Sequence, residues 1–287
     1  MNRQNTVEKE FFLEGKGLQT GEPVKVFFYP EEENRGITFI RGDLAGKPAV
    51  TLGGMSELDN DRRSKIGFGG GNYVETVEHI LAALWGAGID NVKIELDKPE
   101  LPAMDGSAIQ FLEAVKENGI KPQSAERQMI QIKNPIWVER KESFLGIFPS
   151  DVFKISYILE YQNKAIGKQF FSGVLDADIF LKEIAPARTF CLKEEAEALV
   201  KSGYGKGADF KNTLVMDENG PIDNILRFPN EPARHKVLDL IGDLYILGRP
   251  VKGRVIAIRS GHQLNLELVK KIKSQCINSK IQMTKSK

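Results

Sequence analysis

The order of hydrophobic periodicities most constrains the fold of this chain, because the same order occurs twice. In the first half, apolar residues alternate with period two at residues 6–13, 24–29 and 36–41, and then follow helical spacing at 76–86. A strand pattern at 91–96 comes next, and Asp105-Gly106-Ser107 opens a second helical pattern, with Ser107 as a candidate cap. These patterns predict antiparallel strands, a helix, a short strand, a glycine-containing turn and a closing helix.

The same order recurs in the second half. Strand patterns at 128–138, 144–148, 153–160 and 168–174 precede a helix at 193–202, a strand at 213–216 and a long helix at 232–247. A strand at 253–258 and a helix opened by Ser260-Gly261-His262 complete it. The polar segment 119–128, with its glycine and proline, is a plausible domain boundary. We therefore expect a duplicated α+β unit, with domains at 1–120 and 128–272 and a basic tail at 273–287.

Composition excludes several classes of protein. Lys and Arg total 40 against 39 Asp and Glu, so no net field steers the chain to nucleic acid. Cys191 and Cys276 are too few for a disulfide framework, which favours a reducing compartment. The first ten residues lack the apolar core of a signal peptide, and the apolar run at 80–89 is shorter than the ~18 residues that a spanning helix needs. We expect a cytoplasmic protein with no transmembrane segment and no nucleic-acid partner.

The chain has three histidines, and each lies beside turn or acidic residues at the edge of an apolar element. His235 and Asp239 are four residues apart, so they project from one helical face about 5–6 Å apart, a spacing that suits two ligands of one ion. Asp243 lies on the same stripe one turn later. A solvated ion pair at i and i+4 gives the same spacing, so both interpretations stay open from these residues alone.

Each of the other two histidines belongs to a local pattern that suits acid or base chemistry, through Glu78 in one case and through His262 itself in the other. Glu78 and His79 begin an apolar helix, and adjacent helical residues point about 100° apart, so Glu78 lies near any ion on His79 without sharing it. That placement suits a general base, and a buried or capping histidine is the alternative. His262 lies at a strand-to-helix turn, where a carboxylate such as Asp243 would favour its protonated form. A general acid or oxyanion stabiliser needs that form, and a capping role is again the alternative.

Several long motifs carry a resemblance to a known family. They are TVEHILAALWGAGIDN at 76–91, PELPAMDGSA at 99–108, APARTF at 185–190, EPARHKVLDLIGDLYILG at 231–248 and SGHQLN at 260–265, together with GKGLQTGEPV near the N-terminus. The chain resembles the UDP-3-O-acyl-N-acetylglucosamine deacetylases, the zinc amidases of lipid A synthesis, from about residue 6 to residue 272. The motifs stand in family order at family-like spacing, which makes the resemblance highly specific.

The resemblance implies a zinc site and a set of catalytic groups. The ligands of the Zn2+ ion fall on His79, His235 and Asp239, which leaves a fourth position for water. The catalytic groups are a general base, a histidine paired with an aspartate, and a threonine that contacts the oxyanion: Glu78, His262, Asp243 and Thr189. The implied reaction removes the N-acetyl group of UDP-3-O-(3-hydroxyacyl)-N-acetylglucosamine as acetate. We expect a monomer whose partner is this small-molecule substrate, an acylated UDP-amino sugar.

The resemblance also implies the substrate contacts and the fold. The contacts fall on Lys236, Phe190, Glu195 and Leu192. An inserted element after Phe190, with Leu192, Leu199 and Tyr204, would form an acyl passage, although these residues would equally serve as helix core. The implied fold has two similar domains, each a layered β-sheet with helices, whose helix layers pack together between the sheets with the metal at their junction.

The sequence departs from the family pattern at two places. Gln19 stands where the family usually has a histidine, which bears on substrate contacts more than on the metal. The glycine-rich segment from Arg62 to Tyr73 differs from many family members near the reacting sugar. We interpret its three consecutive glycines as a loop and not as a phosphate cradle. A zinc amidohydrolase for another acylated amino sugar is therefore one rival function. A non-catalytic sugar-nucleotide binding protein is the other, but it should have lost one of the proposed metal or catalytic residues, and none is missing.

Overall fold

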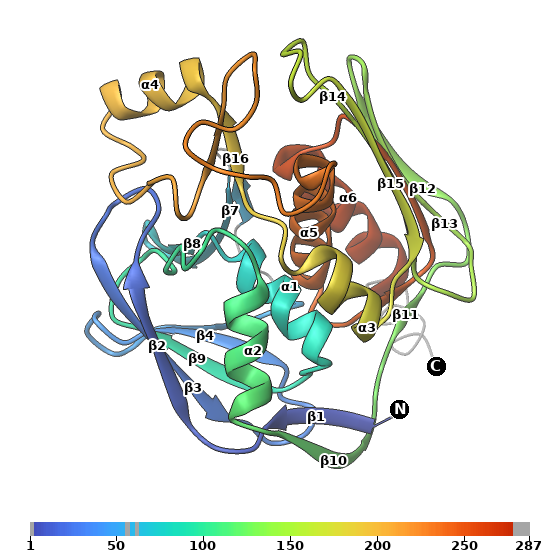
Figure 1. Ribbon diagram of the computed structural model, residues 1–287. Helices are drawn as coiled ribbons and strands as arrows, with labels where there is room; N and C mark the ends of the chain where they lie inside the picture. Colours follow the sequence, from blue (N-terminus) through green and yellow to red (C-terminus); the bar gives the residue numbers. More distant parts are fainter. Residues whose placement is uncertain (1–2, 55–57, 61–62, 278–287) are drawn as a thin grey trace.

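The computed structural model describes residues 3–54, 58–60 and 63–277, and a five-stranded sheet forms the core of its first half (Figure 1). Its strands, in spatial order, are β2 (Phe11–Lys16), β3 (Pro23–Pro30), β9 (Val92–Leu96), β4 (Ile37–Arg41) and β5 (Ala49–Thr51). On β3, Val24, Val26 and Phe28 are buried on one face while Lys25 is exposed on the other, as the period-two pattern predicts. The β4–β9 pair is parallel and the other pairs are antiparallel.

The second half contains a five-stranded sheet with the same topology. Its strands, in spatial order, are β12 (Ile136–Arg140), β13 (Ser143–Phe148), β19 (Arg254–Ile258), β14 (Lys154–Glu160) and β15 (Lys168–Val174). In the first sheet β9 lies between β3 and β4, and in the second β19 lies between β13 and β14. The β19–β14 pair is parallel, like β9–β4, and the other pairs of the second sheet are antiparallel. The shared strand order and pairing support the duplicated α+β unit, while its domain boundaries stay a prediction.

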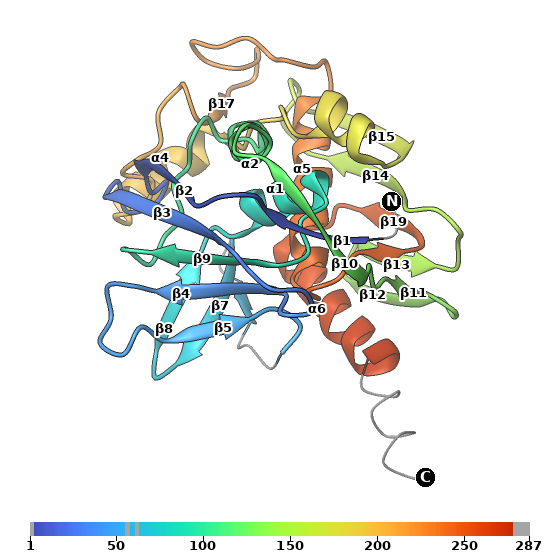
Figure 2. The ribbon, with the colours of Figure 1, turned by 90° about the horizontal axis from the view of Figure 1, so that it is seen from below.

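Four helices fill the space between the two sheets (Figures 1 and 2). They are α1 (Glu78–Ala87), α2 (Ile109–Glu117), α5 (Glu231–Tyr245) and α6 (His262–Ile272). α1 and α5 pack against each other. Gly242 permits this approach, because a Cβ atom there would lie 2.0 Å from the carbonyl oxygen of Glu78. The layered arrangement predicted from the resemblance is confirmed, and the α1–α5 contact brings the histidine-bearing helices of both halves together.

Shorter elements complete the chain. Two small sheets have two strands each: β1 (Arg3–Val7) pairs with β10 (Ile120–Glu126), and β11 (Ile130–Gln131) pairs with β18 (Val251–Lys252). A three-stranded sheet consists of β6 (Leu58–Asn60), β7 (Ser64–Gly69) and β8 (Asn72–Glu75). The segment 190–216, where we expect the inserted element, contains β16 (Phe190–Leu192), α4 (Lys193–Lys201) and β17 (Leu214–Met216). The remaining elements are α3 (Ala177–Ile179) and the π-helical turns η1 (Phe180–Ile184) and η2 (Lys273–Ile277). None of the helices in the described part of the chain is long and apolar enough to cross a membrane.

Local structure differs from the sequence patterns at several places. The pattern at 6–13 divides between β1 and β2. Most of the polar segment 119–128 forms β10, for which no strand was predicted, and Gln123 and Ser124 bond to the body of the protein. α2 begins at Ile109 after Ala108, so Ser107 is not its N-cap, although the Ser107 hydroxyl accepts a hydrogen bond from the Ile109 amide.

The three consecutive glycines form the turn of the β7–β8 hairpin, as the loop interpretation expects. Residues 69–71 turn the chain with φ angles of 81°, 61° and 80°, which glycine adopts most readily. Arg62 and residues 278–287 of the basic tail lie outside the described residues.

Candidate active site

A buried cluster of two histidines and one aspartate lies where α1 meets α5. α1 supplies His79 in its first turn, and α5 supplies His235 and Asp239 from successive turns of one face. Asp239 Oδ1 lies 3.2 Å from His235 Nε2 and 3.7 Å from His79 Nε2. The potential ligand atoms all lie within 4.8 Å of one another, and the described residues contain no other such group of three. This arrangement can hold a metal ion.

The protonation and hydrogen bonding of the cluster fit a divalent cation. Asp239 Oδ1 and His79 Nδ1 are buried and have no hydrogen-bond partner among the residues that the structure describes. His235 Nδ1 lies 3.1 Å from the carbonyl oxygen of Ala187, which can only accept, so Nδ1 carries the proton and Nε2 keeps a free lone pair. Burial lowers the pKa of His235 to about 3 and also lowers the pKa of His79, so both imidazoles are in the neutral, ligating form.

The electrostatics of Asp239 point the same way. Burial alone would raise the pKa of its carboxyl, but nearby positive charge, including that of Lys236 and His262, holds it well below the usual range. Lys236 Nζ donates to Asp239 Oδ2 at 2.8 Å and leaves Oδ1 to the cluster. A permanently ionised carboxylate beside two neutral imidazoles is a ligand set that zinc accepts.

A second group of titratable side chains lies next to the cluster. His262, the first residue of α6, lies with its Nε2 3.9 Å from Glu78 Oε1 and 3.7 Å from Asp239 Oδ2. Its Nδ1 donates to Asp243 Oδ2 at 2.9 Å, and Asn265 donates to the same oxygen at 2.8 Å. The imidazole is therefore oriented by one carboxylate and faces another.

The pKa values of Glu78 and His262 are both displaced toward neutral or mildly basic pH. Burial is the main cause for Glu78 and raises its pKa to about 7, although the His262 charge opposes the shift. Burial lowers the pKa of His262, but the carboxylates of Asp243, Asp239 and Glu78 outweigh it and raise the pKa to about 9. Near neutral pH, Glu78 can accept a proton while His262 carries one, which is the condition for general acid and base catalysis.

A cavity of about 730 Å³ opens onto these groups and draws its lining from both halves of the chain. Its cationic side chains are Arg63, Arg140, Lys236 and Arg259. Its larger apolar side chains, most of them from the insert, are Leu18, Phe190, Leu199, Val200, Phe210, Val215 and Leu264. A ligand that carries both negative charge and an apolar chain would match this lining.

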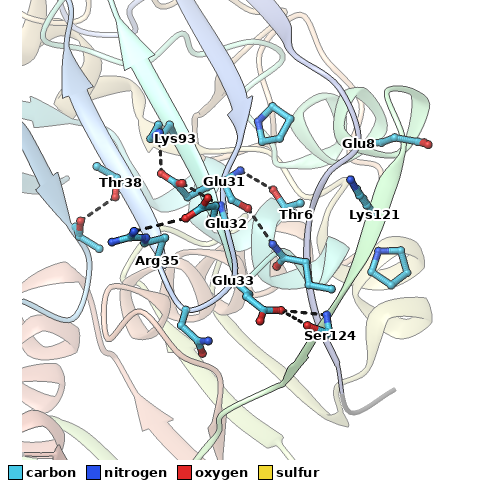
Figure 3. Close-up of a pocket in the computed structure, with 15 residues that line it drawn as sticks. Thr6, Glu8, Glu31, Glu32, Glu33, Arg35, Thr38, Lys93, Lys121 and Ser124 are labelled. Atoms are coloured by element: carbon cyan, nitrogen blue, oxygen red, sulfur yellow. Dashed lines mark hydrogen bonds and ion pairs between the residues drawn. The ribbon is translucent and has the colours of Figure 1, made fainter.

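A second hollow, between the β3–β4 turn and β10, has a different character (Figure 3). Several of its charged side chains have polar partners: Glu31 pairs with Lys93 at 3.0 Å, and Glu33 accepts from the Ser124 hydroxyl at 2.6 Å. The metal-binding cluster lies elsewhere. These pairs give the hollow a structural role in joining β10 to the first sheet.

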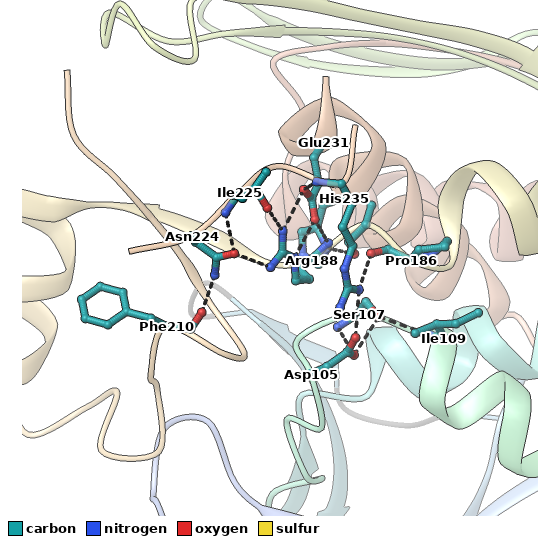
Figure 4. Close-up of polar contacts among 12 residues, drawn as sticks. Asp105, Ser107, Ile109, Pro186, Arg188, Phe210, Asn224, Ile225, Glu231 and His235 are labelled. Carbon is teal, nitrogen blue, oxygen red and sulfur yellow. Dashed lines mark hydrogen bonds and ion pairs between the residues drawn. The ribbon is translucent and has the colours of Figure 1, made fainter. Parts of the chain in front are cut away.

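A buried ion pair holds the segment that runs beside the metal cluster (Figure 4). The Arg188 guanidinium donates to Glu231 Oε1 at 2.9 Å and to Asn224 Oδ1 at 2.8 Å. Ala187 and Thr189 flank Arg188 in the sequence. The Ala187 carbonyl oxygen accepts from His235, and the Thr189 amide donates to the Gly106 carbonyl oxygen at 2.7 Å. The ion pair thereby fixes both the orientation of one histidine and one wall of the cavity.

Comparison with known proteins identifies the family. The model of the UDP-3-O-acyl N-acetylglycosamine deacetylase family, LpxC, matches residues 4–274. The chain belongs to this family. A UDP-3-O-acyl-N-acetylglucosamine deacetylase of Chlamydia abortus is 38% identical over 271 residues, which cover 94% of this chain and 96% of the relative. The deacetylase of the same name from Leptospira biflexa is 35% identical over 284 residues, covering 99% of this chain and 94% of the relative. One from Anaeromyxobacter dehalogenans is 38% identical over 271 residues, covering 94% and 87%.

For this member of the deacetylase family, most residues named from sequence lie around one cavity. Four polar residues of the cavity lining come from both halves: Glu78, His235, Asp239 and His262. His79 and Asp243 lie behind them, in contact with Asp239 and His262. Gln19, Thr189, Phe190, Glu195, Leu199 and Lys236 line the cavity. Leu192 instead packs against the hydrophobic core, and the Tyr204 ring lies under the Arg63 guanidinium at 5.4 Å. The catalytic and binding roles of these residues stay predictions.

Sequence reasoning missed four residues that support the site: Ser64, Arg188, Glu231 and Asn265. Arg188, Glu231 and Asn265 stand inside the motifs that carry the resemblance, and this membership was the available signal. Ser64 had no comparable signal, because its partners lie far away in sequence and the segment around it resembles the family least.

Proposed function

We propose that this chain is a zinc-dependent deacetylase that hydrolyses the N-acetyl group of UDP-3-O-(3-hydroxyacyl)-N-acetylglucosamine in lipid A biosynthesis. The products are acetate and UDP-3-O-(3-hydroxyacyl)-glucosamine. One observation carries the proposal: a ligand set of His79, His235 and Asp239 adjoins Glu78 and His262 at the base of a cavity with cationic and apolar walls. The names of the relatives supply the substrate.

The metal proposed for the cluster is zinc. Two imidazole nitrogens and one carboxylate oxygen form a common catalytic zinc set, which keeps a fourth position open. Zinc bound there supplies Lewis-acid chemistry, because it polarises a carbonyl group and makes water acidic enough to ionise near neutral pH. The chain holds the ligands ready through the Ala187 bond to His235 and the Lys236 bond to Asp239.

Glu78 and His262 divide the proton chemistry. The Glu78 carboxylate takes a proton from the attacking water, since its raised pKa makes it basic enough at neutral pH. Protonated His262 and the Thr189 hydroxyl stabilise the negative charge that develops on the amide oxygen. The departing amine then needs one proton. Glu78 can return the one it accepted, or His262 can donate its own, and both routes conserve protons.

The two kinds of cavity wall suit the two ends of the substrate. Arg140 and Arg259 lie on the lining and offer positive charge to a diphosphate. Leu199, Val215 and Phe210 offer apolar surface to an acyl chain. An amphiphilic UDP sugar is therefore a better match than an unacylated one. A cytoplasmic location and a monomeric state stay predictions from the sequence.

The test is acetate release from the acylated and unacylated UDP sugars by the zinc-loaded protein. We expect strong preference for the acylated substrate and a fall in kcat of about 10²–10⁴ in Glu78→Gln. Glu32→Gln, in the polar hollow of Figure 3, is the control carboxylate and should keep full activity. Equal turnover of both sugars would favour an amidohydrolase for another amino sugar. Sugar-nucleotide binding without acetate release would favour a binding protein.

A further inference from the structure

Ser64, the first residue of β7, contacts two carboxylates of the proposed site at once. Its backbone amide donates to Glu78 Oε2 at 3.2 Å, and its hydroxyl donates to Asp243 Oδ1. The side chain is completely buried and does not line the substrate cavity. Glu78 belongs to α1 and Asp243 to α5, so this serine joins the two helices that carry the site.

The hydroxyl completes the hydrogen bonding of Asp243. Asp243 Oδ2 accepts from His262 Nδ1 at 2.9 Å and from Asn265 Nδ2 at 2.8 Å, while Oδ1 accepts from Ser64. A carboxylate accepts hydrogen bonds only, and its terminal torsion is soft, so donors on both oxygens are needed to fix its plane. Without the hydroxyl, Oδ1 would lose this donor in a buried place and the carboxylate could turn, carrying the His262 ring with it.

Ser64 is itself held by the hairpin that precedes α1. Its carbonyl oxygen accepts from the Thr76 amide at 3.0 Å, two residues before α1 begins. Next to it, Arg63 Nε donates to Glu75 Oε2 at 2.8 Å, across the same hairpin. The β7–β8 hairpin and the first turn of α1 therefore form one rigid support, and the serine extends that support to α5.

We propose that Ser64 is a positioning residue that ties the two carboxylates, Glu78 and Asp243, to one rigid hairpin. Through Asp243 it orients the His262 imidazole, so that the proton donor and the proton acceptor keep a fixed relation. This role rests on the proposed function, since it matters for turnover only if Glu78 and His262 act in the reaction. Its geometric part, the orientation of the His262 ring, can be measured without substrate.

The first experiment compares Ser64→Ala and Ser64→Thr as zinc-loaded enzymes. Alanine removes the hydroxyl and keeps the amide donor, so we expect kcat to fall about 10- to 100-fold with KM changed less than about threefold and with the zinc content unchanged. Threonine keeps the hydroxyl and should restore most of kcat. Ser156→Ala, whose hydroxyl bonds Ser172 at 2.9 Å on the second sheet, is the control and should behave as wild type.

The second experiment separates this role from a general loss of structure. The chain has three histidines, so nitrogen-15 labelling of histidine gives few ring signals to assign. We expect Ser64→Ala to shift the Nδ1–H signal of His262 while the His79 and His235 signals stay in place. In an Asp243→Asn background, Ser64→Ala should cost less than about threefold in kcat, because its partner is already altered.

Each outcome has a definite meaning. An unchanged His262 signal in Ser64→Ala, or the same 10- to 100-fold loss in the Asp243→Asn background, would overturn the positioning role. Failure of the wild-type enzyme to release acetate would overturn the proposed function instead, and the His262 signal would still test the geometry.

Discussion

Replacing Glu231 with glutamine is expected to destabilise the protein by about 3–5 kcal/mol, because it leaves a buried guanidinium without its counter-charge. Glu231 is completely buried and accepts from the Arg188 Nε at 2.9 Å, from the Arg188 amide at 3.0 Å and from the Arg227 amide at 2.6 Å. Glutamine keeps the volume but not the charge, so Arg188 stays buried while its main electrostatic compensation is lost.

The assay is urea unfolding of the zinc-loaded protein, with zinc affinity measured beside it. With a slope of about 3 kcal/mol per molar urea, the midpoint should fall by about 1–1.7 M. Because Arg188 lies between Ala187 and Thr189, its displacement also loosens the carbonyl that orients His235, and zinc affinity should fall about 10- to 100-fold.

The control is an ion pair in full contact with solvent. Glu32 and Arg35 lie 3.5 Å apart at the surface, and Glu32→Gln should leave the urea midpoint unchanged. If Glu231→Gln unfolds at the wild-type midpoint and binds zinc as tightly, the ion pair does not hold this segment and the reasoning fails.

Three further predictions test the site. In the proposed mechanism Glu78 is deprotonated and His262 is protonated, so kcat/KM should rise with pH through about 7 and fall through about 9. If the pH profile of His262→Gln keeps the alkaline fall, the assignment of that fall to His262 is refuted. His235→Ala should lose zinc by metal analysis, whereas His262→Ala should keep it and still lose about 10²–10⁴ in kcat. Gly242→Ala should destabilise the protein by about 1–3 kcal/mol in urea unfolding, because the new Cβ would lie 2.0 Å from the Glu78 carbonyl oxygen. A Gly242→Ala protein as stable as the wild type would contradict the close α1–α5 contact.

Hydrophobic periodicity predicted most strands of the two large sheets and the helices between them, but it gave no strand at β5. One face of β3 is buried, and nearly the whole surface of α5 is buried. The burial that stabilises each element is therefore visible in its own hydrophobic pattern. β10 was missed because its stability comes from polar bonds to distant residues, such as Asn91 Nδ2 donating to Gln123 at 2.7 Å. Such bonds leave no periodic pattern.

The same distinction applies to the site. The i, i+4 spacing placed His235 and Asp239 together, and the family motifs added His79 and His262 from other helices. Spacing alone could not choose between a metal site and a solvated pair, because the deciding facts, burial and an unpartnered carboxylate oxygen, depend on tertiary packing. Ser64 was out of reach for that reason: its hydroxyl meets Asp243 across 179 residues of sequence.

The duplicated architecture explains why the site needs both halves. α1 precedes the strand β9 in the first unit, and α5 precedes the equivalent strand β19 in the second, so the two helices that meet at the metal cluster hold equivalent places. Each carries one histidine near its start, His79 or His235, but only α5 adds aspartates one and two turns later. The first half supplies Glu78 and the second supplies its proposed partner His262. Because neither half has all three proposed ligands or both proposed proton-transfer groups, the proposed catalytic arrangement exists only at the interface, where Gly242 lets the helices approach.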